Sequence, residues 1–119
     1  MTGLGELETR VMDVLWLVQA PISVRAVHTE LARERDLAYT TVLTVLDRLT
    51  KKSLVSRVRH GRLWLYSAEY SREDLVARRV LDLLGTEPQA RRAALAEVIG
   101  RLPQSDRGAL IELLTRTAS

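Results

Sequence analysis

The chain has 119 residues, which is enough for one compact domain with a helical extension. The hydrophobic fraction of 46% is ordinary for a soluble globular protein. The chain has no cysteine, which excludes disulfides, thiolate metal sites and cysteine catalysis, and only 4% aromatic residues, so its core must be aliphatic. It has no membrane-length apolar run and no secretion-signal pattern at its start. We therefore expect a soluble, cytoplasmic protein with no stable membrane insertion. The net charge of +3 is by itself a weak sign of nucleic-acid binding.

The first half of the chain predicts three helices. Apolar residues at a spacing of three and four indicate the first, at about Leu4–Val18, which ends before Pro21. Ser23 is placed to cap a second helix that reaches about Arg35. A short link leads to a third, at about Ala38–Lys52, so the last two helices form a helix-turn-helix. The expected inner face of the third helix carries Val42, Val45, Leu46 and Leu49.

A basic β-hairpin follows the third helix. Its predicted strands are Leu54–Arg59 and Arg62–Ser67, with the two residues between them as the turn. In this register Arg57 lies opposite Trp64, where a guanidinium group can stack on the indole. The predicted fold class is mainly α: a winged helix-turn-helix, with three helices and a two-stranded β wing, followed by a C-terminal helical dimerisation tail.

Three apolar helices form the predicted tail, at about Ser71–Leu84, Pro88–Arg101 and Ser105–Arg116. Three short helices make a poor core by themselves, so we expect a second copy of the chain to cover them. The expected domains are a winged-helix DNA-binding domain at 1–69 and a helical dimerisation domain at 70–119. The candidate interface residues are Leu75, Val76, Val80, Leu83, Leu84, Leu95, Val98, Ile99, Leu102, Leu110, Ile111 and Leu114.

The third helix and the hairpin together are typical of a protein that reads the major groove of double-stranded DNA. From Arg48 to Ser67 the chain carries six lysine or arginine residues and no acid. Threonine hydroxyls bond several base edges and a leucine can cover a thymine methyl group. Asp47 is awkward near phosphate and is expected either to pair with Lys51 one turn later or to lie past the base-reading zone. The candidate base-reading residues are Thr40, Thr41, Leu43 and Thr44, and the candidate phosphate-binding residues are Arg25, Tyr39, Arg48, Lys51, Lys52, Arg59 and Arg62.

No catalytic, metal or cofactor site is indicated, and we do not expect an enzyme. The sequence has no nucleophile with a recognisable base and no glycine-rich phosphate loop, and its two histidines, His28 and His60, are isolated. Two alternatives to a DNA-binding regulator of this kind remain. One is a ligand-sensing winged-helix regulator, with a small molecule between tail and wing. The other is a winged-helix protein–protein adaptor that does not bind DNA.

Short motifs along residues 4–68 add a family resemblance. The motifs are Leu7-Glu8, Val11-Met12-Asp13 and Leu15-Trp16, then Tyr39-Thr40-Thr41-Val42, Thr44, Leu46, Arg48-Leu49 and Lys51-Lys52, and they resemble those of BlaI/MecI-type repressors (the penicillinase repressor family). The resemblance implies a homodimeric winged-helix repressor on a palindromic operator, linked to a β-lactam or cell-envelope stress response. In relatives the C-terminal helices form the dimer, and a membrane sensor-protease that detects β-lactams often relieves repression by triggering proteolysis in that tail.

The chain also departs from this family in two respects. Some members are cut at an Asn–Phe bond, and this chain contains neither asparagine nor phenylalanine. The copper-responsive branch carries a cysteine-rich C-terminal hook, which a chain without cysteine excludes. Any cleavage on induction must therefore use another bond.

Overall fold

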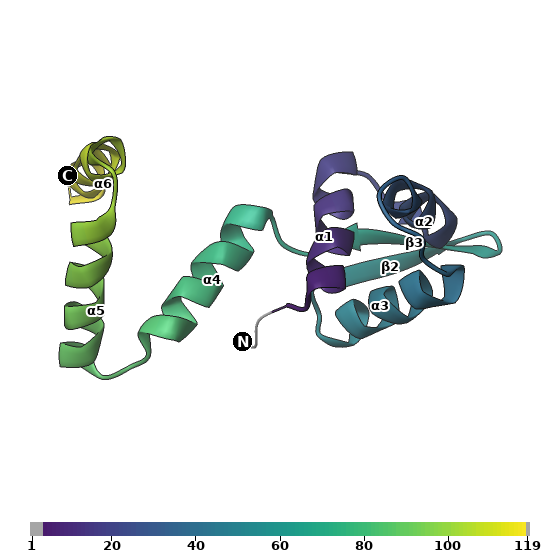
Figure 1. Ribbon diagram of the computed structural model, residues 1–119, viewed down its shortest axis with the longest axis horizontal. Coiled ribbons are helices and arrows are strands. Elements are labelled where there is room, and N and C mark those ends of the chain that lie inside the picture. The colour runs from purple at the N-terminus through teal and green to yellow at the C-terminus, as the bar shows by residue number, and fades with distance from the viewer. Residues whose placement is uncertain (1–3, 119) are drawn as a thin grey trace. The chain divides into compact units, whose positions relative to one another are not determined.

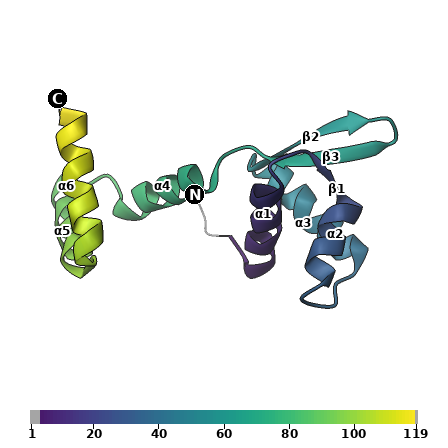
Figure 2. The ribbon, with the colours of Figure 1, turned by 90° about the horizontal axis from the view of Figure 1, so that it is seen from above.

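The computed structural model describes residues 4–118, and residue contacts divide the chain into unit 1, up to Arg79, and unit 2, from Val80. Figure 1 labels the helices and the two longer strands, and Figure 2 also labels the short first strand. In chain order they are α1 (Glu6–Val18), β1 (Ile22–Ser23), α2 (Val24–Ala32), α3 (Tyr39–Lys51), β2 (Val55–His60), β3 (Leu63–Ala68), α4 (Arg72–Leu84), α5 (Pro88–Arg101) and α6 (Gln104–Ala118). The division falls inside α4, and no helix in residues 4–118 is long and apolar enough to cross a membrane.

Local hydrogen bonds fix where the first two helices of unit 1 begin. The Gly5 N–H donates to the Glu8 carboxylate at 3.1 Å, which satisfies a free donor at the start of α1. Ser23 caps α2 as predicted, because its hydroxyl accepts from the Ala26 N–H at 3.2 Å. Helix α2 ends at Ala32, short of the predicted Arg35.

Helix α3 ends in a turn that usually requires glycine. The Leu54 N–H donates to the Leu49 carbonyl and the Ser53 N–H to the Thr50 carbonyl, each at 3.0 Å, which is the hydrogen-bond pattern of a Schellman motif. Ser53 occupies its left-handed position, with φ of 63°. A serine side chain is strained there, and glycine is not.

The hairpin turn differs from the predicted one. β2 and β3 pair with His60 opposite Leu63, so the two residues of the turn are Gly61 and Arg62. Gly61, at the first central position, has φ of 64°, which a type II′ hairpin turn requires there. Glycine adopts this angle at no steric cost, whereas the predicted turn placed it second.

The new turn moves every cross-strand partner by two residues but keeps the strand faces. Arg57 pairs with Tyr66 rather than with Trp64, and Arg59 is the residue opposite Trp64. Because side chains alternate between faces, a two-residue shift leaves all of these on the predicted side of the sheet. The strand β1, which the sequence did not predict, pairs with the other edge of β3 and gives the order β1-β3-β2.

The core of unit 1 lies between the sheet and its helices (Figure 2), and it is aliphatic except for Tyr66 and the thioether of Met12. All four predicted inner residues of α3 are buried. On α1, Met12 is buried and Val18 is exposed at the end of the helix. This differs from the apolar stripe that the three-and-four spacing predicts, which is Leu4, Leu7, Val11, Val14, Leu15 and Val18. The buried residues are Val11, Met12, Leu15, Ile22, Val24, Val27, Leu31, Val42, Val45, Leu46, Leu49, Leu54, Val55, Tyr66 and Leu75.

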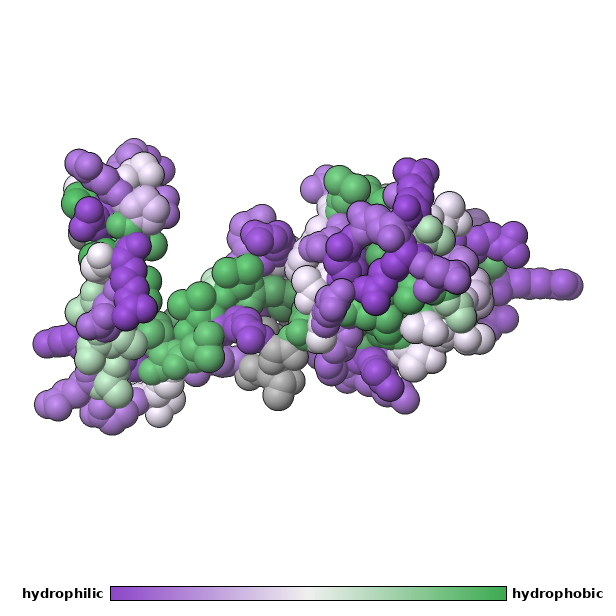
Figure 3. Space-filling model, in the orientation of Figure 1, coloured by the Kyte–Doolittle hydropathy of each residue, from purple (hydrophilic) through white to green (hydrophobic). Residues whose placement is uncertain are grey.

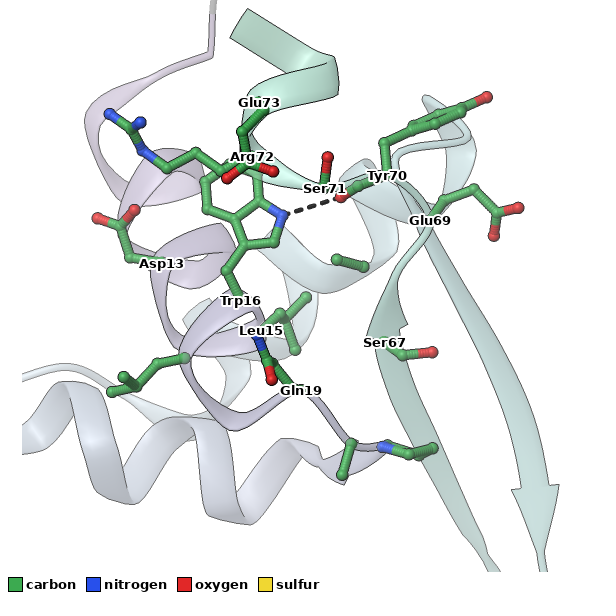
Figure 4. Close-up of a pocket in the computed structure, with 14 residues that line it drawn as sticks. Asp13, Leu15, Trp16, Gln19, Ser67, Glu69, Tyr70, Ser71, Arg72 and Glu73 are labelled. Carbon is green, nitrogen blue, oxygen red and sulfur yellow. Dashed lines mark hydrogen bonds between the residues drawn. The ribbon is translucent and has the colours of Figure 1, made fainter.

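The start of α4 belongs to unit 1. The Trp16 indole N–H donates to the Tyr70 carbonyl at 2.9 Å and so fixes the segment between β3 and α4 to α1 (Figure 4). Ser71 caps α4 by accepting from the Asp74 N–H at 3.1 Å. Leu75, one turn into the helix, is 5% exposed and joins the core, so its side chain is not available as the predicted dimer contact.

Unit 2 contains the rest of α4 and the last two helices. Gly85 follows α4 with φ of 73°, Glu87 caps α5 with Pro88 in its first turn, and α6 begins at Gln104, one residue before the prediction. Neither α5 nor the described part of α6 buries any residue. Figure 3 shows hydrophobic surface along α4 and α5. The exposed large hydrophobic residues of this unit are Val80, Leu81, Leu83, Leu95, Val98, Ile99, Ile111, Leu113 and Leu114.

Candidate nucleic-acid interface

The outer face of α3 presents hydroxyl and basic groups to solvent. Thr40, Thr41 and Thr44 are exposed along its first half, and Arg48 and Lys51 are exposed along its second half. The helix keeps this face outward because the opposite face is fully engaged in the core. All five residues are predicted DNA contacts, and the structure gathers them on one continuous exposed face.

Two different surfaces flank this face of α3. On one side, Leu43 is half-buried and lines a cavity together with wing residues, and Asp47 approaches the wing. On the other side, a second cavity is lined by Thr41, Thr44 and Arg48 together with the start of α1. The predicted base reader Leu43 therefore lies on the wing side and not with the three threonines.

The cavity on the wing side has a volume of about 550 Å³ and brings several predicted clamps together. Arg25 from the first turn of α2, Tyr39 from the start of α3 and Arg62 from the hairpin turn line it, although they are far apart in sequence. Trp64 and Leu43 complete an apolar part of its wall. The cavity therefore offers cationic groups for a phosphate beside apolar surface for a sugar or a methyl group.

The link before α3 is held by a histidine. One ring nitrogen of His28 lies 2.7 Å from the Leu37 carbonyl oxygen. The same ring contacts Tyr39 edge-on, with 6.1 Å between the ring centroids. His28 thus orients the first residue of α3, and no group of three or more His, Cys, Asp or Glu residues in the part of the chain that the structure describes could hold a metal.

Thr44 is restricted in the base contacts that it can make. Its hydroxyl donates to the Thr40 carbonyl at 2.9 Å, so in this arrangement its proton is engaged within the helix. The lone pairs of the oxygen stay free to accept from the amino group of adenine or cytosine. Thr44 is therefore suited to accept a hydrogen bond from a base rather than to donate one.

The basic clamps differ in how freely they can reach a phosphate. Arg48, Lys51 and Lys52 are all exposed, but Lys52 is also bound to Glu8, with 2.7 Å between Nζ and Oε2. The hydrogen bond from Lys52 lowers the pKa of the Glu8 carboxyl, burial opposes the shift, and the Gly5 N–H and the charges of Lys52 and Arg48 lower the pKa further. A phosphate at Lys52 would therefore have to share the ammonium group with the Glu8 carboxylate or displace it.

The wing contains two residues that the candidate site omitted, Arg57 and Trp64. The Arg57 guanidinium carbon lies 4.3 Å from the centroid of the Trp64 ring, and the Arg59 carbon lies 5.4 Å from it. Arg57 also faces Asp47, with 3.8 Å between Nη1 and Oδ1, so the expected partner of Asp47, Lys51, is not the partner observed. A local helix rule could not find this pair, because it joins α3 to β2 across the fold.

Another cavity lies away from α3. The cavity shown in Figure 4 has a volume of about 580 Å³ and lies between α1 and the segment that joins β3 to α4. Its charged residues Asp13, Glu69, Arg72 and Glu73 are all exposed, and the described residues include no buried charged or polar side chain. A ligand-sensing pocket needs convergent polar groups in an enclosed site, and this cavity does not supply them.

A helix-turn-helix with an exposed hydroxyl-rich second helix and an adjoining basic hairpin defines a winged-helix DNA-binding protein. The model of the penicillinase repressor family matches residues 4–116, which is most of the chain. The transcriptional regulator BlaI of Mycobacterium tuberculosis (strain H37Rv) is 46% identical over 101 residues, which cover 83% of this chain and 73% of that protein. The chain therefore belongs to the penicillinase repressor family.

Solved structures of the family agree with this assignment. The solution structure of the DNA-binding domain of the repressor BlaI matches 60% of this chain and 85% of its own length, at 28% identity and a TM-score of 0.53. The monomeric form of Bacillus licheniformis BlaI, solved in complex with the blaP half-operator, matches 61% of this chain and 88% of its own length, at 27% identity and a TM-score of 0.52. The family consists of transcriptional regulators and not of enzymes.

Proposed function

We propose that this DNA-binding transcriptional repressor of the BlaI type acts in the cytoplasm as a homodimer, with one unit 1 on each half of a palindromic operator. The observation that carries the proposal is the exposed outer face of α3 beside the basic wing cavity, in a chain that belongs to a repressor family. The α3 helices of the two copies enter successive major grooves about one helical turn, or 34–36 Å, apart. The proposed domain roles are DNA binding for residues 1–69 and dimerisation for 70–119.

The base contacts fall to the first half of α3. Thr40, Thr41 and Thr44 supply hydroxyls to base edges, and Leu43 covers a thymine methyl group at the wing side. Each of these contacts is modest, so sequence preference arises from several of them in each of two half-sites. Thr44→Val tests this, since it removes the hydroxyl and keeps the shape, and Thr115→Val on α6 removes the same kind of intrahelical hydrogen bond as a control.

The phosphate contacts surround the base-reading face. Arg25, Tyr39 and Arg62 reach the backbone from the wing cavity, and the exposed clamps of α3 reach it from the other end of the helix. Each contact that is lost reduces the slope of log affinity against log salt by about one. Arg62→Ala is expected to lower this slope, whereas Arg101→Ala, an exposed arginine of unit 2, is expected to leave it unchanged. The remaining proposed backbone contacts are Arg48, Lys51, Lys52 and Arg59.

Unit 2 supplies the dimer interface in this proposal. Its helices carry large apolar side chains and bury almost none of them within the chain, so a second copy covers them. Light scattering is expected to give a dimer for the intact chain and a monomer for a chain that ends at Arg79, which retains Leu75 in its core. The proposed interface residues of unit 2 are Val80, Leu83, Leu84, Leu95, Val98, Ile99, Leu102, Leu110, Ile111 and Leu114. Val76, on the part of α4 that belongs to unit 1, is also proposed, and Leu75 is left out.

Induction by a cell-wall signal is a further part of the proposal. Membership of the penicillinase repressor family supports a link to β-lactam or cell-envelope stress, with a membrane sensor-protease as the partner that relieves repression. Since the chain has neither asparagine nor phenylalanine, cleavage uses another bond in unit 2. Mass spectrometry of the chain recovered from cells of its own source, before and after exposure to a β-lactam, is expected to show a shortened product. If the mass is unchanged although repression is lost, proteolysis does not relieve repression and the sensor-protease is not the partner.

Selection from a randomised DNA library tests the function as a whole. The intact chain is expected to enrich an inverted repeat and to bind it at about 0.15 M salt at least a thousandfold more tightly than random DNA. Equal binding to all sequences would indicate an architectural protein. No binding would indicate the adaptor instead.

A further inference from the structure

Four side chains join α3 to the hairpin on one face of the wing, and we call them the wing brace. Asp47 of α3 faces Arg57 of β2, with 3.8 Å between the carboxylate oxygen and the guanidinium nitrogen. The guanidinium groups of Arg57 and Arg59 lie over the ring of Trp64 from β3, at 4.3 Å and 5.4 Å from its centroid. The brace therefore runs from the recognition helix through one arginine to an indole and on to a second arginine.

The strand register brings the three wing residues of the brace together. Arg59 is directly opposite Trp64, and Arg57 is opposite Tyr66, the next residue on the same face of β3. Arg57 is therefore the diagonal neighbour of Trp64, within reach of a long side chain. A guanidinium within about 6 Å of an indole centroid is attracted to the face of the ring, so both arginines qualify.

Core packing does not hold this part of the hairpin. All residues from Arg57 to Trp64 are exposed, whereas Val55 at the start of β2 and Tyr66 on β3 are buried. The outer half of the hairpin thus extends beyond the apolar core, as Figure 2 shows. Without another constraint, an exposed two-stranded ribbon bends and twists freely relative to the body that carries it.

We propose that Asp47 and Trp64 are positioning residues that hold Arg57 and Arg59, and with them the outer half of the wing, at a fixed distance from α3. The inference rests on the proposed DNA-binding function and deepens it. With α3 in a major groove, the wing must meet the backbone beside that groove at one definite separation. A wing that is already held at this distance loses less conformational freedom on binding. The resulting gain in affinity is obtained only on DNA that α3 fits.

Whether Asp47→Asn tightens or weakens DNA binding tests the proposal. A carboxylate beside DNA repels phosphates of any sequence, so if Asp47 were only a surface acid, Asp47→Asn would tighten binding to operator and random DNA alike. If Asp47 instead anchors Arg57, loss of its carboxylate frees the wing while all the basic groups remain. Binding to the operator then weakens relative to random DNA.

The experiment measures the ratio of affinities for the selected inverted repeat and for random DNA, at one salt concentration. Asp47→Asn and Trp64→Leu are each expected to lower this ratio by roughly three- to tenfold. The double variant is expected to lower it no further than the larger single effect, because both changes release the same two arginines. Trp64→Phe, which keeps a ring face, is expected to recover most of the loss, and Asp13→Asn, an exposed acid of α1, leaves the ratio unchanged.

A second readout separates a released wing from a misfolded one. In a Trp16→Phe background, Trp64 is the sole tryptophan, and Asp47→Asn is expected to increase acrylamide quenching of its fluorescence while the circular dichroism stays the same. Unchanged ratios for both single variants, or equal tightening on both DNAs with Asp47→Asn, would overturn the brace. A native chain with a ratio near one would instead overturn the proposed function itself.

Discussion

Unit 1 and unit 2 use apolar residues in opposite ways. In the described chain every buried hydrophobic residue lies in unit 1, which has a core of its own, whereas unit 2 leaves nine large hydrophobic residues exposed on three helices. A unit that buries its apolar face within one chain is stable alone, and a unit that does not must find that burial elsewhere. The difference suggests that unit 1 recognises DNA as an independent module and that unit 2 gains its stability by assembly.

The largest expected effect comes from the core of unit 1. Leu46→Ala on α3 removes a side chain that is 0% exposed, and about 2–5 kcal/mol of unfolding free energy should be lost. Leu83→Ala in unit 2, where the side chain is 76% exposed, should leave the unfolding of unit 1 within about 0.5 kcal/mol of the native value. Urea titration followed by circular dichroism measures both. A similar loss for the two variants would show that the units do not differ in this way.

The next effect concerns assembly. Val98→Glu together with Ile99→Glu places two charges among apolar residues of α5 that are 49% and 41% exposed. Burying such charges in an interface costs several kcal/mol, so the dimer should weaken by at least about a hundredfold. Analytical ultracentrifugation measures the dissociation constant, and Glu97→Gln, also on α5, serves as a mild control. If the double variant dimerises as strongly as the native chain, this part of α5 does not lie in the interface.

A gain in stability is expected at the end of α3. Ser53 adopts φ of 63° in the Schellman turn, so Ser53→Gly removes the clash of its Cβ and should stabilise unit 1 by about 0.5–1 kcal/mol. The more flexible unfolded chain offsets part of this gain. Thermal unfolding measures the shift, and Ser105→Gly at the start of α6 lacks a left-handed φ and should give no gain. A lower melting temperature for Ser53→Gly would contradict the strain.

The smallest effect concerns Glu8 and depends on pH. Its pKa is lowered in the folded state, so its stabilising effect is present above the unfolded pKa and is lost as pH falls through the folded pKa. Glu8→Gln removes the ion pair with Lys52 and keeps a side-chain oxygen for the Gly5 N–H, and should cost about 0.5–1 kcal/mol at pH 7. Unfolding of the native chain and of the variant should converge in acid. A constant difference across pH would exclude the carboxylate as the cause.

The sequence predicted helix faces better than it predicted contacts between elements. The inner residues of α3, the cap at Ser23 and the start of a helix at Ser71 follow from local periodicity and chemistry, and the structure confirms them. The turn was misplaced because Gly61 suits either central position of a two-residue turn, and only the pairing of the strands decides between them.

Long-range partners were beyond what local patterns contain. The pairs Lys52–Glu8 and Asp47–Arg57 join separate elements, so their partners depend on how α1, α3 and β2 pack. The strand β1 was missed because two residues are too few to show alternation. The wing cavity likewise combines residues of α2, α3 and the hairpin that no single motif connects.

The proposed division is that unit 1 binds DNA and unit 2 forms the dimer. It is tested most directly by comparing binding to a full operator with binding to one half of it. The affinities of the intact chain and of the chain ending at Arg79 would be measured on the selected inverted repeat and on a single half-site. The intact chain should bind the inverted repeat at least about a hundredfold more tightly than the single half-site, because the second half-site is engaged within one complex. The affinity of the shortened chain, counted per half-site, should be the same on the two DNAs within about a factor of two. A shortened chain that keeps the full preference would contradict the account, since unit 1 would then assemble on DNA without unit 2.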